Sequence, residues 1–258
     1  MRRAISLVVL FLVSAAPTAV FAQWGNVVMS FSYDGKPPAA KALGGVKPEC
    51  AMVPPVPDET WIVSPAGDVQ NVVVYLLAEK GVKLPIHPSF DKAKGTAVRI
   101  DNAKCRFEPR ITIKYTNQDL ILGNKDLFGH NVNGTFFNNL SFNVLIPAMT
   151  DHKRRAVEEK LDLHEPSQGV LACNIHPHMK GYLFIHSHPY SGISDAKGSL
   201  TIKNVPQGEW NFVMWHEAGG FIKEGLLGTA KTPTKWTKGR MKIKVGPGVN
   251  AVGPVVFK

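Results

Sequence analysis

The feature that most constrains this chain is a short run of sulfur and nitrogen donors, Cys173-Asn-Ile-His176-Pro-His-Met179. Cys173, His176 and Met179 are spaced three residues apart, and a strand with its two-residue period cannot present such a set on one face. Pro177 disfavours a continuous helix, and Gly181 precedes a new apolar run. The segment is therefore predicted to be a loop that leaves one strand and returns into another.

A fourth candidate donor, His130, lies upstream in Phe128-Gly-His-Asn-Val132. One thiolate, two imidazoles and a thioether form the donor set of blue-copper electron-transfer sites, in which the thioether is a weak axial ligand. Each residue alone is more often a core or surface residue. Together, in this order and spacing, they predict a site for one copper ion held by His130, Cys173, His176 and Met179.

The motif and its surroundings resemble a known family. The C-x-x-H-P-x-M loop with a preceding H-N-V is similar to the cupredoxins, most closely to the amicyanin-like type with a short ligand loop. The wider context is similar to bacterial plastocyanin-like proteins often labelled methylamine-utilisation proteins. It comprises Cys105-Arg-Phe-Glu-Pro109, Asn124-Lys-Asp126, Ile146-Pro147 and residues 173–181. The resemblance implies an all-β fold, a cupredoxin Greek-key β-sandwich, with the same four residues as copper ligands.

The tail is similar to transthyretin-like, carboxypeptidase-regulatory modules through Pro189-Tyr190, Asn204-Val-Pro206 and Trp215-His-Glu217. The expected division is a signal peptide at 1–22, an N-terminal strand and connecting arm at 23–68, a cupredoxin domain at 69–188 and a β module at 189–258. The N-terminal segment is expected to pack beside this module.

Each predicted ligand has its own task. Cys173 must be a thiolate and is the strongest link to the ion. His130 should be buried, with its other nitrogen held by an acceptor. His176 is expected near the surface, where it is the exit for an electron, and Met179 tunes the potential. Asn131 and Asn174 are the candidates for supporting contacts; for Asn131 the alternative is plain turn chemistry.

The amino terminus indicates export. Arg2 and Arg3 precede an apolar run at 5–13, and Val20-Phe-Ala22 stands before a plausible cleavage ahead of Gln23. A membrane anchor, the alternative, needs a longer apolar span. In an oxidising compartment Cys50 and Cys105 then form a natural disulfide, leaving Cys173 for copper. The bridge is expected to stabilise the chain by roughly 4 kcal/mol.

Composition agrees with a folded, exported protein. The chain has 258 residues, 44% of them hydrophobic, and a net charge of +10. Two of its positive charges, Arg2 and Arg3, belong to the expected signal peptide and would be removed with it. A positive surface steers acidic partners, so a redox partner protein with an acidic docking face is expected. Nucleic acid is disfavoured because Lys and Arg are scattered rather than clustered. No segment after the first 22 residues reads as a membrane span.

Short β-branched or aromatic runs, separated by Gly, Pro, Asn or Asp, predict strands throughout. They are 27–33, 71–77, 110–115, 119–122, 142–146, 169–173 and 182–186, followed in the tail by 199–203, 210–215 and 241–245. Many short strands with turns between them favour a β-sandwich. The one helical candidate, 151–161, is equally consistent with a solvated loop.

Three functions remain open. One-electron transfer at a periplasmic or secreted type 1 copper site is the prediction, and the protein is not expected to be an enzyme. Copper storage or delivery, or a binding module that keeps the fold, is the alternative. A copper enzyme needs an open coordination position and usually a second metal centre. His178 stands between two predicted ligands, and His186, His188 and His216 can build a second centre only if the tail folds back over the domain.

Overall fold

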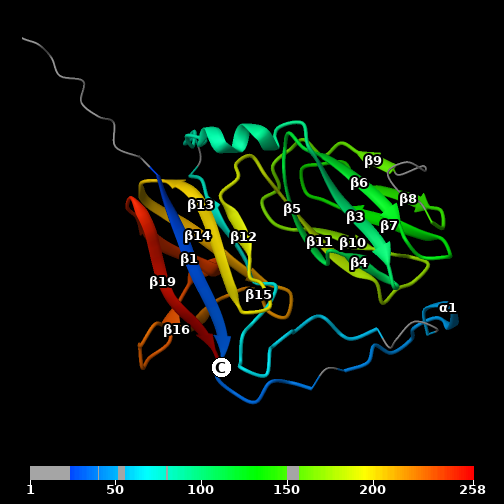
Figure 1. Cartoon of the computed structure of the whole chain (residues 1–258), viewed down its shortest axis with the longest axis horizontal. Helices are drawn as coiled ribbons and strands as arrows, with labels where there is room; N and C mark the ends of the chain where they lie inside the picture. Colours follow the sequence, from blue (N-terminus) through cyan, green and yellow to red (C-terminus); the bar gives the residue numbers. More distant parts are fainter. Residues whose placement is uncertain (1–23, 40, 52–55, 80, 150–156) are drawn as a thin grey trace, which may run out of the picture.

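The structure is a computed structural model, and it describes residues 24–39, 41–51, 56–79, 81–149 and 157–258. The predicted signal peptide lies outside the described residues. Strands dominate, and they form two lobes that lie side by side (Figure 1). The described helices are short: α1 (Pro48–Ala51), and two 3-10 turns, η1 (Pro88–Ala93) and η2 (Thr237–Gly239). None of them has both the length and the apolar character needed to cross a bilayer.

The first lobe is a sandwich of two sheets. One sheet has the order β5-β11-β10-β7-β8, with bounds Ile111–Tyr115, Lys180–His186, Gly169–Ala172, His130–Thr135 and Phe142–Ile146. The facing sheet has the order β4-β3-β6-β9, with bounds Arg106–Glu108, Ala97–Ala103, Asp119–Asn124 and Val157–Glu159. Their shared core includes Ile100, Phe107, Leu120, Leu122, Val132, Ile146, Leu171, Leu183 and Ile185. The predicted all-β sandwich is confirmed.

The second lobe is also built from two sheets. One has the order β13-β1-β19-β16-β17, with bounds Ser199–Pro206, Trp24–Tyr33, Gly248–Phe257, Glu224–Leu227 and Thr234–Lys235. The other has the order β12-β2-β14-β15, with bounds Ser191–Ile193, Val73–Leu77, Gly208–His216 and Gly220–Phe221. Strand β18 (Arg240–Val245) also pairs with β14. The expected packing of the N-terminal strand with the tail is confirmed, because β1 pairs with both β13 and β19.

The two lobes meet through the outer faces of their sheets. On β2, Val74 and Leu76 face the core of the second lobe, whereas Val73 and Tyr75 face the junction. Strand β11 alternates in the same way: Leu183 and Ile185 point into the first lobe, whereas Tyr182 and Phe184 point into the junction. Strands buried on both faces read as continuous apolar runs, which is why these segments lack a polar face.

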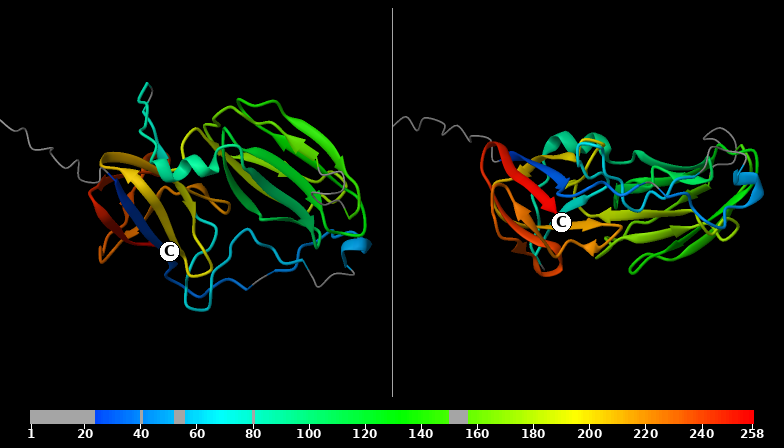
Figure 2. Two further views of the ribbon diagram at one scale, coloured as in Figure 1. Left: turned by 45° about the horizontal axis from the view of Figure 1, so that its top comes forward. Right: turned by 90° about the horizontal axis from the view of Figure 1, so that it is seen from below.

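The N-terminal arm spans the molecule. After β1 the chain leaves the second lobe, runs along the first lobe to α1 at its far end and returns to β2 (Figures 1 and 2). A bridge between Ala42 and Pro57 joins the outward and returning segments. Cys50 and Val56 are buried in the core of the first lobe. The arm is therefore more than a connection, since its tip is part of that core.

Two segments differ from expectation. The segment 151–161, expected to be a helix or a solvated loop, instead contains strand β9 at Val157–Glu159, which pairs with β6; residues 151–156 lie outside the described part. Pairing with the edge of the sheet gives the backbone N–H and C=O groups of this segment hydrogen-bond partners. The Arg/Glu pairs would stabilise an isolated helix only weakly, so the strand is favoured. Strand β2, within the expected 69–188 domain, pairs with β12 and β14 of the C-terminal lobe.

Candidate metal centre

The predicted donors meet at one end of the first lobe. His130 is the first residue of β7, and Cys173 directly follows β10, which pairs with β7 through Ala172 and Asn133. Residues 173–179 form the predicted loop before β11. The backbone N–H of Met179 donates to the carbonyl of His176 at 2.9 Å, and that of Cys173 to the carbonyl of Met179 at 3.3 Å. The loop therefore folds back on itself at the ends of two paired strands.

Three donor atoms form a compact triangle. The Cys173 Sγ lies 3.9 Å from Nδ1 of His130 and 3.7 Å from Nδ1 of His176. Bonds of about 2.1 Å to nitrogen and 2.3 Å to sulfur, as at zinc sites, place such donors about 3.6 Å apart in tetrahedral geometry and about 3.8 Å apart in trigonal geometry. The nitrogen and sulfur atoms thus fit one ion with small adjustments. All three side chains are at most 1% exposed.

The far nitrogen of each imidazole faces a carboxylate. His130 Nε2 lies 2.9 Å from Asp126 Oδ2, and His176 Nε2 lies 3.0 Å from Glu49 Oε1. A carboxylate can only accept, so Nε2 carries a proton in each ring, and in the neutral imidazole Nδ1 is then the nitrogen whose lone pair is available on the Cys173 side. Imidazoles that bind metals usually donate their other N–H to a carboxylate or carbonyl. The donor chemistry therefore fits a metal ion at both histidines.

The pKa values reflect this environment. Burial opposes ionisation of the Cys173 thiol, but the His130 ring and several backbone N–H groups outweigh it and lower the pKa. For His130 burial disfavours the cation, yet Asp126 and Cys173 raise the pKa overall. Burial dominates at His176 and lowers its pKa, although Glu49 opposes the shift. A thiol that ionises readily beside a neutral imidazole favours a soft metal ion.

Asn131, on strand β7, connects this strand to the loop of residues 173–179. Its Oδ1 accepts the backbone N–H groups of Asn174 at 2.7 Å and Ile175 at 3.2 Å, and it lies 3.4 Å from Cys173 Sγ. The Asn174 side chain instead accepts from Asn133 at an exposed position. Asn131 thus holds the turn after Cys173, and Asn174 contributes mainly through its backbone.

Met179 lies beneath the loop. Its side chain is 2% exposed and belongs to the same core cluster as Cys173 and Val132. Phe128 packs against both imidazoles, with its ring centre 5.3 Å from that of His130 and 5.6 Å from that of His176. Sulfur and aromatic groups exclude water around the donors. The axial role of Met179 stays a prediction.

One expectation about His176 is wrong. The sequence places this residue on a loop and therefore near the surface, but it is only 1% exposed. The reason is the N-terminal arm, whose Glu49 lies over the ring edge from a position 127 residues away in sequence. Sequence reasoning also missed Asp126. Its position four residues before His130 is a signal that could have found it, whereas Glu49 is marked only by its neighbour Cys50.

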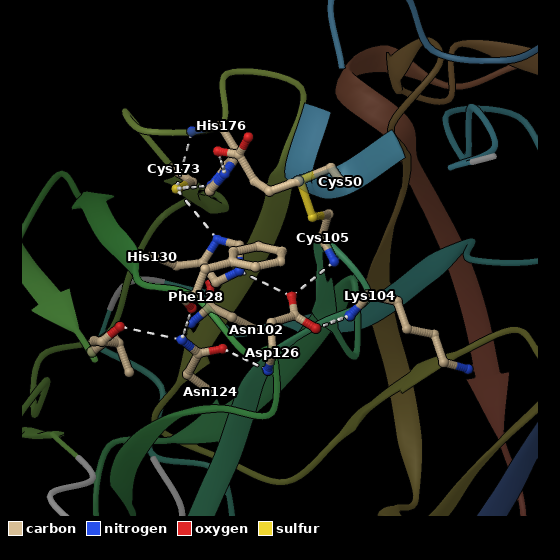
Figure 3. A network of polar contacts seen from close by, with 12 residues as sticks. Cys50, Asn102, Lys104, Cys105, Asn124, Asp126, Phe128, His130, Cys173 and His176 are labelled. Carbon is tan, nitrogen blue, oxygen red and sulfur yellow. Dashed lines mark hydrogen bonds and ion pairs between the residues drawn. A yellow bond between two sulfur atoms is a disulfide. The ribbon is translucent and has the colours of Figure 1, made fainter. Parts of the chain in front are cut away.

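The predicted disulfide is confirmed. Cys50 and Cys105 are bridged and fully buried. The backbone N–H groups of Lys104 and Cys105 donate to Asp126 at 2.6 and 2.9 Å, so the carboxylate that holds His130 also caps the turn carrying the bridge (Figure 3). The disulfide is thus part of the surroundings of the metal centre.

Among the described residues, no group of three metal-ligating side chains combines two of the four histidines considered for a second centre, although the His164 ring lies 5.6 Å from that of His186. His216 Nε2 lies 3.1 Å from the carbonyl of Gln70 in the second lobe. His186 and His188 stack with nearly parallel rings 5.7 Å apart, a geometry in which the ring-plane lone pairs do not converge. His178 packs near the disulfide, whose sulfurs are already bonded to each other. Within the described residues, these histidines therefore do not form a second metal centre, and the sulfur atoms near His178 are not free thiolates.

Comparisons with known proteins give partial structural similarity. No protein-family model matches the chain, and no curated protein matches its sequence. Among solved structures, a reduced amicyanin variant is 16% identical over 35% of this chain and 82% of its own, with a TM-score of 0.29. A purple cupredoxin from Nitrosopumilus maritimus is 16% identical over 34% of this chain and 97% of its own, with a TM-score of 0.27.

The copper-containing nitrite reductase of Thermus scotoductus SA-01 is likewise 16% identical, with a TM-score of 0.29. The match covers 43% of this chain and 25% of the reductase. The chain therefore spans about a quarter of the length of that enzyme.

Proposed function

We propose that this protein binds one copper ion at His130, Cys173, His176 and Met179 and transfers single electrons. The observation that carries the proposal is the buried triangle of two Nδ1 atoms and one Sγ, in which each imidazole is fixed from behind by a carboxylate. A thiolate with two imidazoles and a weak thioether is the set used by blue-copper sites. The fold proposed for this lobe is that of the cupredoxins.

The protein residues supply the geometry. Copper, when bound, would exchange one electron between its two oxidation states. Asp126 and Glu49 hold the imidazoles in one tautomer, and Asn131 holds the turn that carries Cys173. Core packing around Met179 and Phe128 keeps water away. A site fixed in this way needs little rearrangement when charge changes, which favours rapid electron transfer.

The burial of the donors supports electron transfer over catalysis. An enzyme needs a coordination position open to substrate, whereas the imidazole and thiol side chains here are at most 1% exposed. Electron transfer works through a closed site. Storage or delivery of copper, the second candidate, needs a path for the ion, and a cover that moves would provide it.

Compartment and partner are part of the proposal. The buried disulfide and the apparent signal sequence support a periplasmic or secreted location. Lys47, Lys104 and Lys125 are exposed on segments next to Glu49 and Asp126. They support a partner protein with an acidic docking face. The C-terminal lobe, whose motifs are similar to transthyretin-like modules, is proposed as an accessory β module.

A visible spectrum tests the function. The purified protein loaded with one equivalent of Cu(II) should show an intense thiolate-to-copper band, and Cys173→Ala should abolish it. Asn174→Ala, which alters the exposed side chain beside the ligand, is the matched control and should keep the band. A colourless wild-type protein that binds copper tightly would instead indicate storage or delivery.

A further inference from the structure

The N-terminal arm covers the metal centre. Glu49 on α1 reaches His176 Nε2 at 3.0 Å, and the ring beneath it is 1% exposed while the Glu49 side chain is 38% exposed. Without this segment the outer ring edge of His176 would face solvent, as the position of the loop at the end of the lobe suggests. The arm therefore forms the outermost layer over one ligand.

The attachments of this cover are concentrated near the disulfide. Cys50 and Val56 are buried in the core, with Leu43 and Val46 packed against it. Apart from Glu49 and Asp58, which are half-buried, the other described residues of the tip (41–51 and 56–58) are exposed: Lys41, Ala42, Gly44, Gly45, Lys47, Pro48, Ala51 and Pro57. The backbone N–H of Leu43 donates to the carbonyl of Val56, and that of Asp58 donates to the carbonyl of Lys41. These hydrogen bonds connect parts of the tip with each other and not with the sandwich. The covalent bridge is thus the fixed point nearest Glu49, since the ion pair of Glu59 with Arg106 at 2.7 Å lies beyond the tip.

The same bridge connects the carboxylates behind both imidazoles. Glu49 is the residue before Cys50, and Asp126 accepts the backbone N–H of Cys105 at 2.9 Å. Asp126 and Glu49 each accept from one histidine, as described above. Figure 3 shows the disulfide between the segment of His130 and Asp126 and the segment of α1. The disulfide therefore fixes the position of Glu49 relative to Asp126.

We propose that residues 41–51 and 56–58 are a latched cover for the metal centre, with Cys50–Cys105 as the latch and Glu49 as a positioning residue for His176. The cover controls whether an ion and external reagents reach the His176 ring. With the latch closed, bound copper is retained and its ligands are shielded. When the latch is absent, the tip separates from the sandwich and the ring becomes accessible. The role in copper retention rests on the proposed function, but the covering itself does not.

Chemical labelling of the metal-free protein tests the cover directly. Diethyl pyrocarbonate modifies accessible imidazoles, and mass spectrometry of peptides gives the rate at each histidine. In the oxidised wild type His176 should react at least tenfold more slowly than the exposed His164. In Cys50→Ser/Cys105→Ser the His176 rate should rise at least tenfold, with His164 unchanged. Equal His176 rates in both proteins would overturn the proposal.

A second pair of variants keeps the disulfide intact and remains informative if the serine variant does not fold. Glu49→Gln should raise the His176 rate several-fold because the charge-assisted contact is lost. Asp58→Asn is the matched control, since Asp58 bonds Thr60 within the arm, and should leave the rate unchanged. An unchanged His176 rate in Glu49→Gln, with a normal circular dichroism spectrum, would exclude Glu49 as a positioning residue.

Copper exchange tests the consequence for the ion. Loss of copper to excess chelator, measured as total metal retained after desalting, should be at least tenfold faster in Cys50→Ser/Cys105→Ser and faster in Glu49→Gln than in Asp58→Asn. If every variant lost copper slowly while His176 was labelled rapidly, the segment would still cover His176 but would not control copper retention. Failure of the wild type to bind copper would refute the proposed function, while the labelling result would still decide the covering.

Discussion

At the scale of single residues, three of the proposed donors are fixed by polar contacts and the fourth by packing. His130, Cys173 and His176 are held through side-chain contacts to Asp126, Asn131 and Glu49. Met179 is held by packing and by the loop backbone. A donor fixed by packing alone can be exchanged for an apolar residue of similar volume without dismantling the rest of the site.

Met179→Leu should therefore keep copper and its colour while raising the reduction potential. Removing a soft donor and drying the site disfavours Cu(II) relative to Cu(I), the direction expected when an axial ligand tunes the couple. Protein-film voltammetry measures the change. An unchanged potential would make Met179 a core residue only. His130→Ala, which removes a strong donor, should lose the site outright.

The residues that carry the site could largely be read from the sequence because they are close in the chain and chemically unusual. The Cys173 to Met179 spacing required a loop between strands, and the loop is there. Glu49 could not be found in this way. Its contact depends on a disulfide that joins distant segments, and a single glutamate on an irregular arm has no pattern of its own.

At the scale of elements, the predicted strand bounds agree best with the structure where apolar and polar residues alternate. Strand β8 was predicted at 142–146 and has the bounds Phe142–Ile146, because its residues alternate between the two sides of the sheet. Strand β19 (Gly248–Phe257) was not predicted. It contains Gly253 and Pro254, which usually exclude a central strand, yet it pairs in parallel with β1, with a register shift between Met29 and Phe31. Tertiary pairing overrides local preference there.

The loop between β7 and β8 depends on one buried carboxylate. Glu165 is 1% exposed and accepts the backbone N–H groups of Phe137, Asn138 and Asn139 at 2.8 to 2.9 Å. Burial raises the pKa of this acid, but the hydrogen bonds from Asn139 and its neighbours lower it overall. The loop is thus held in one shape while Phe137 remains 78% exposed.

Glu165→Gln should reduce the free energy of unfolding by about 2 kcal/mol at pH 7, because hydrogen bonds to a charged acceptor are lost. Since the folded pKa lies below the unfolded value, the advantage is complete above about pH 4.5 and disappears as the pH falls further. Urea unfolding at pH 7 and pH 3.5 measures it. The control Asp91→Asn alters an exposed ion pair and should change little. A difference that does not shrink between pH 7 and pH 3.5 would contradict this account.

At the scale of the whole molecule, one ion pair joins the two lobes. Arg110, beside β5, donates through Nε and Nη2 to both carboxylate oxygens of Glu217 at 2.7 Å, and Tyr182 donates to Glu217 at 3.1 Å. Trp215 packs against Tyr182 with ring centres 4.9 Å apart. Apolar and charged contacts therefore coincide at this junction, and the lobes should unfold together.

Glu217→Ala should lower the free energy of unfolding by about 3 kcal/mol, because it leaves the Arg110 guanidinium with a weaker partner, Glu59 at 3.6 Å. Glu209→Ala removes an exposed pair and is the control, with an expected change near zero. Chemical denaturation followed by fluorescence measures both variants. Equal stabilities, or two separate transitions already in the wild type, would show that this contact does not couple the lobes.

Two histidines at the same junction make the assembly sensitive to acid. His186 packs against Tyr75, with ring centres 4.6 Å apart, and His188 stacks between His186 and Tyr190. Burial lowers the pKa of His188 to about 4, with His164 adding repulsion, and burial lowers that of His186 well below its usual value. Both rings are therefore neutral in the folded protein at pH 7.

The unfolded chain binds a proton at His188 below about pH 6.5, whereas the folded protein does not until near pH 4, so acid favours unfolding. Stability from His188 is complete above pH 6.5 and should fall by about 3 kcal/mol as the pH drops to 4. In His188→Gln the neutral amide keeps an acceptor for the Tyr190 N–H but cannot gain this charge. Urea unfolding between pH 7 and 4 should give a shallower loss of stability in the variant than in the wild type. Parallel curves would mean that His188 can be protonated without opening the junction, and that the lobes separate for another reason.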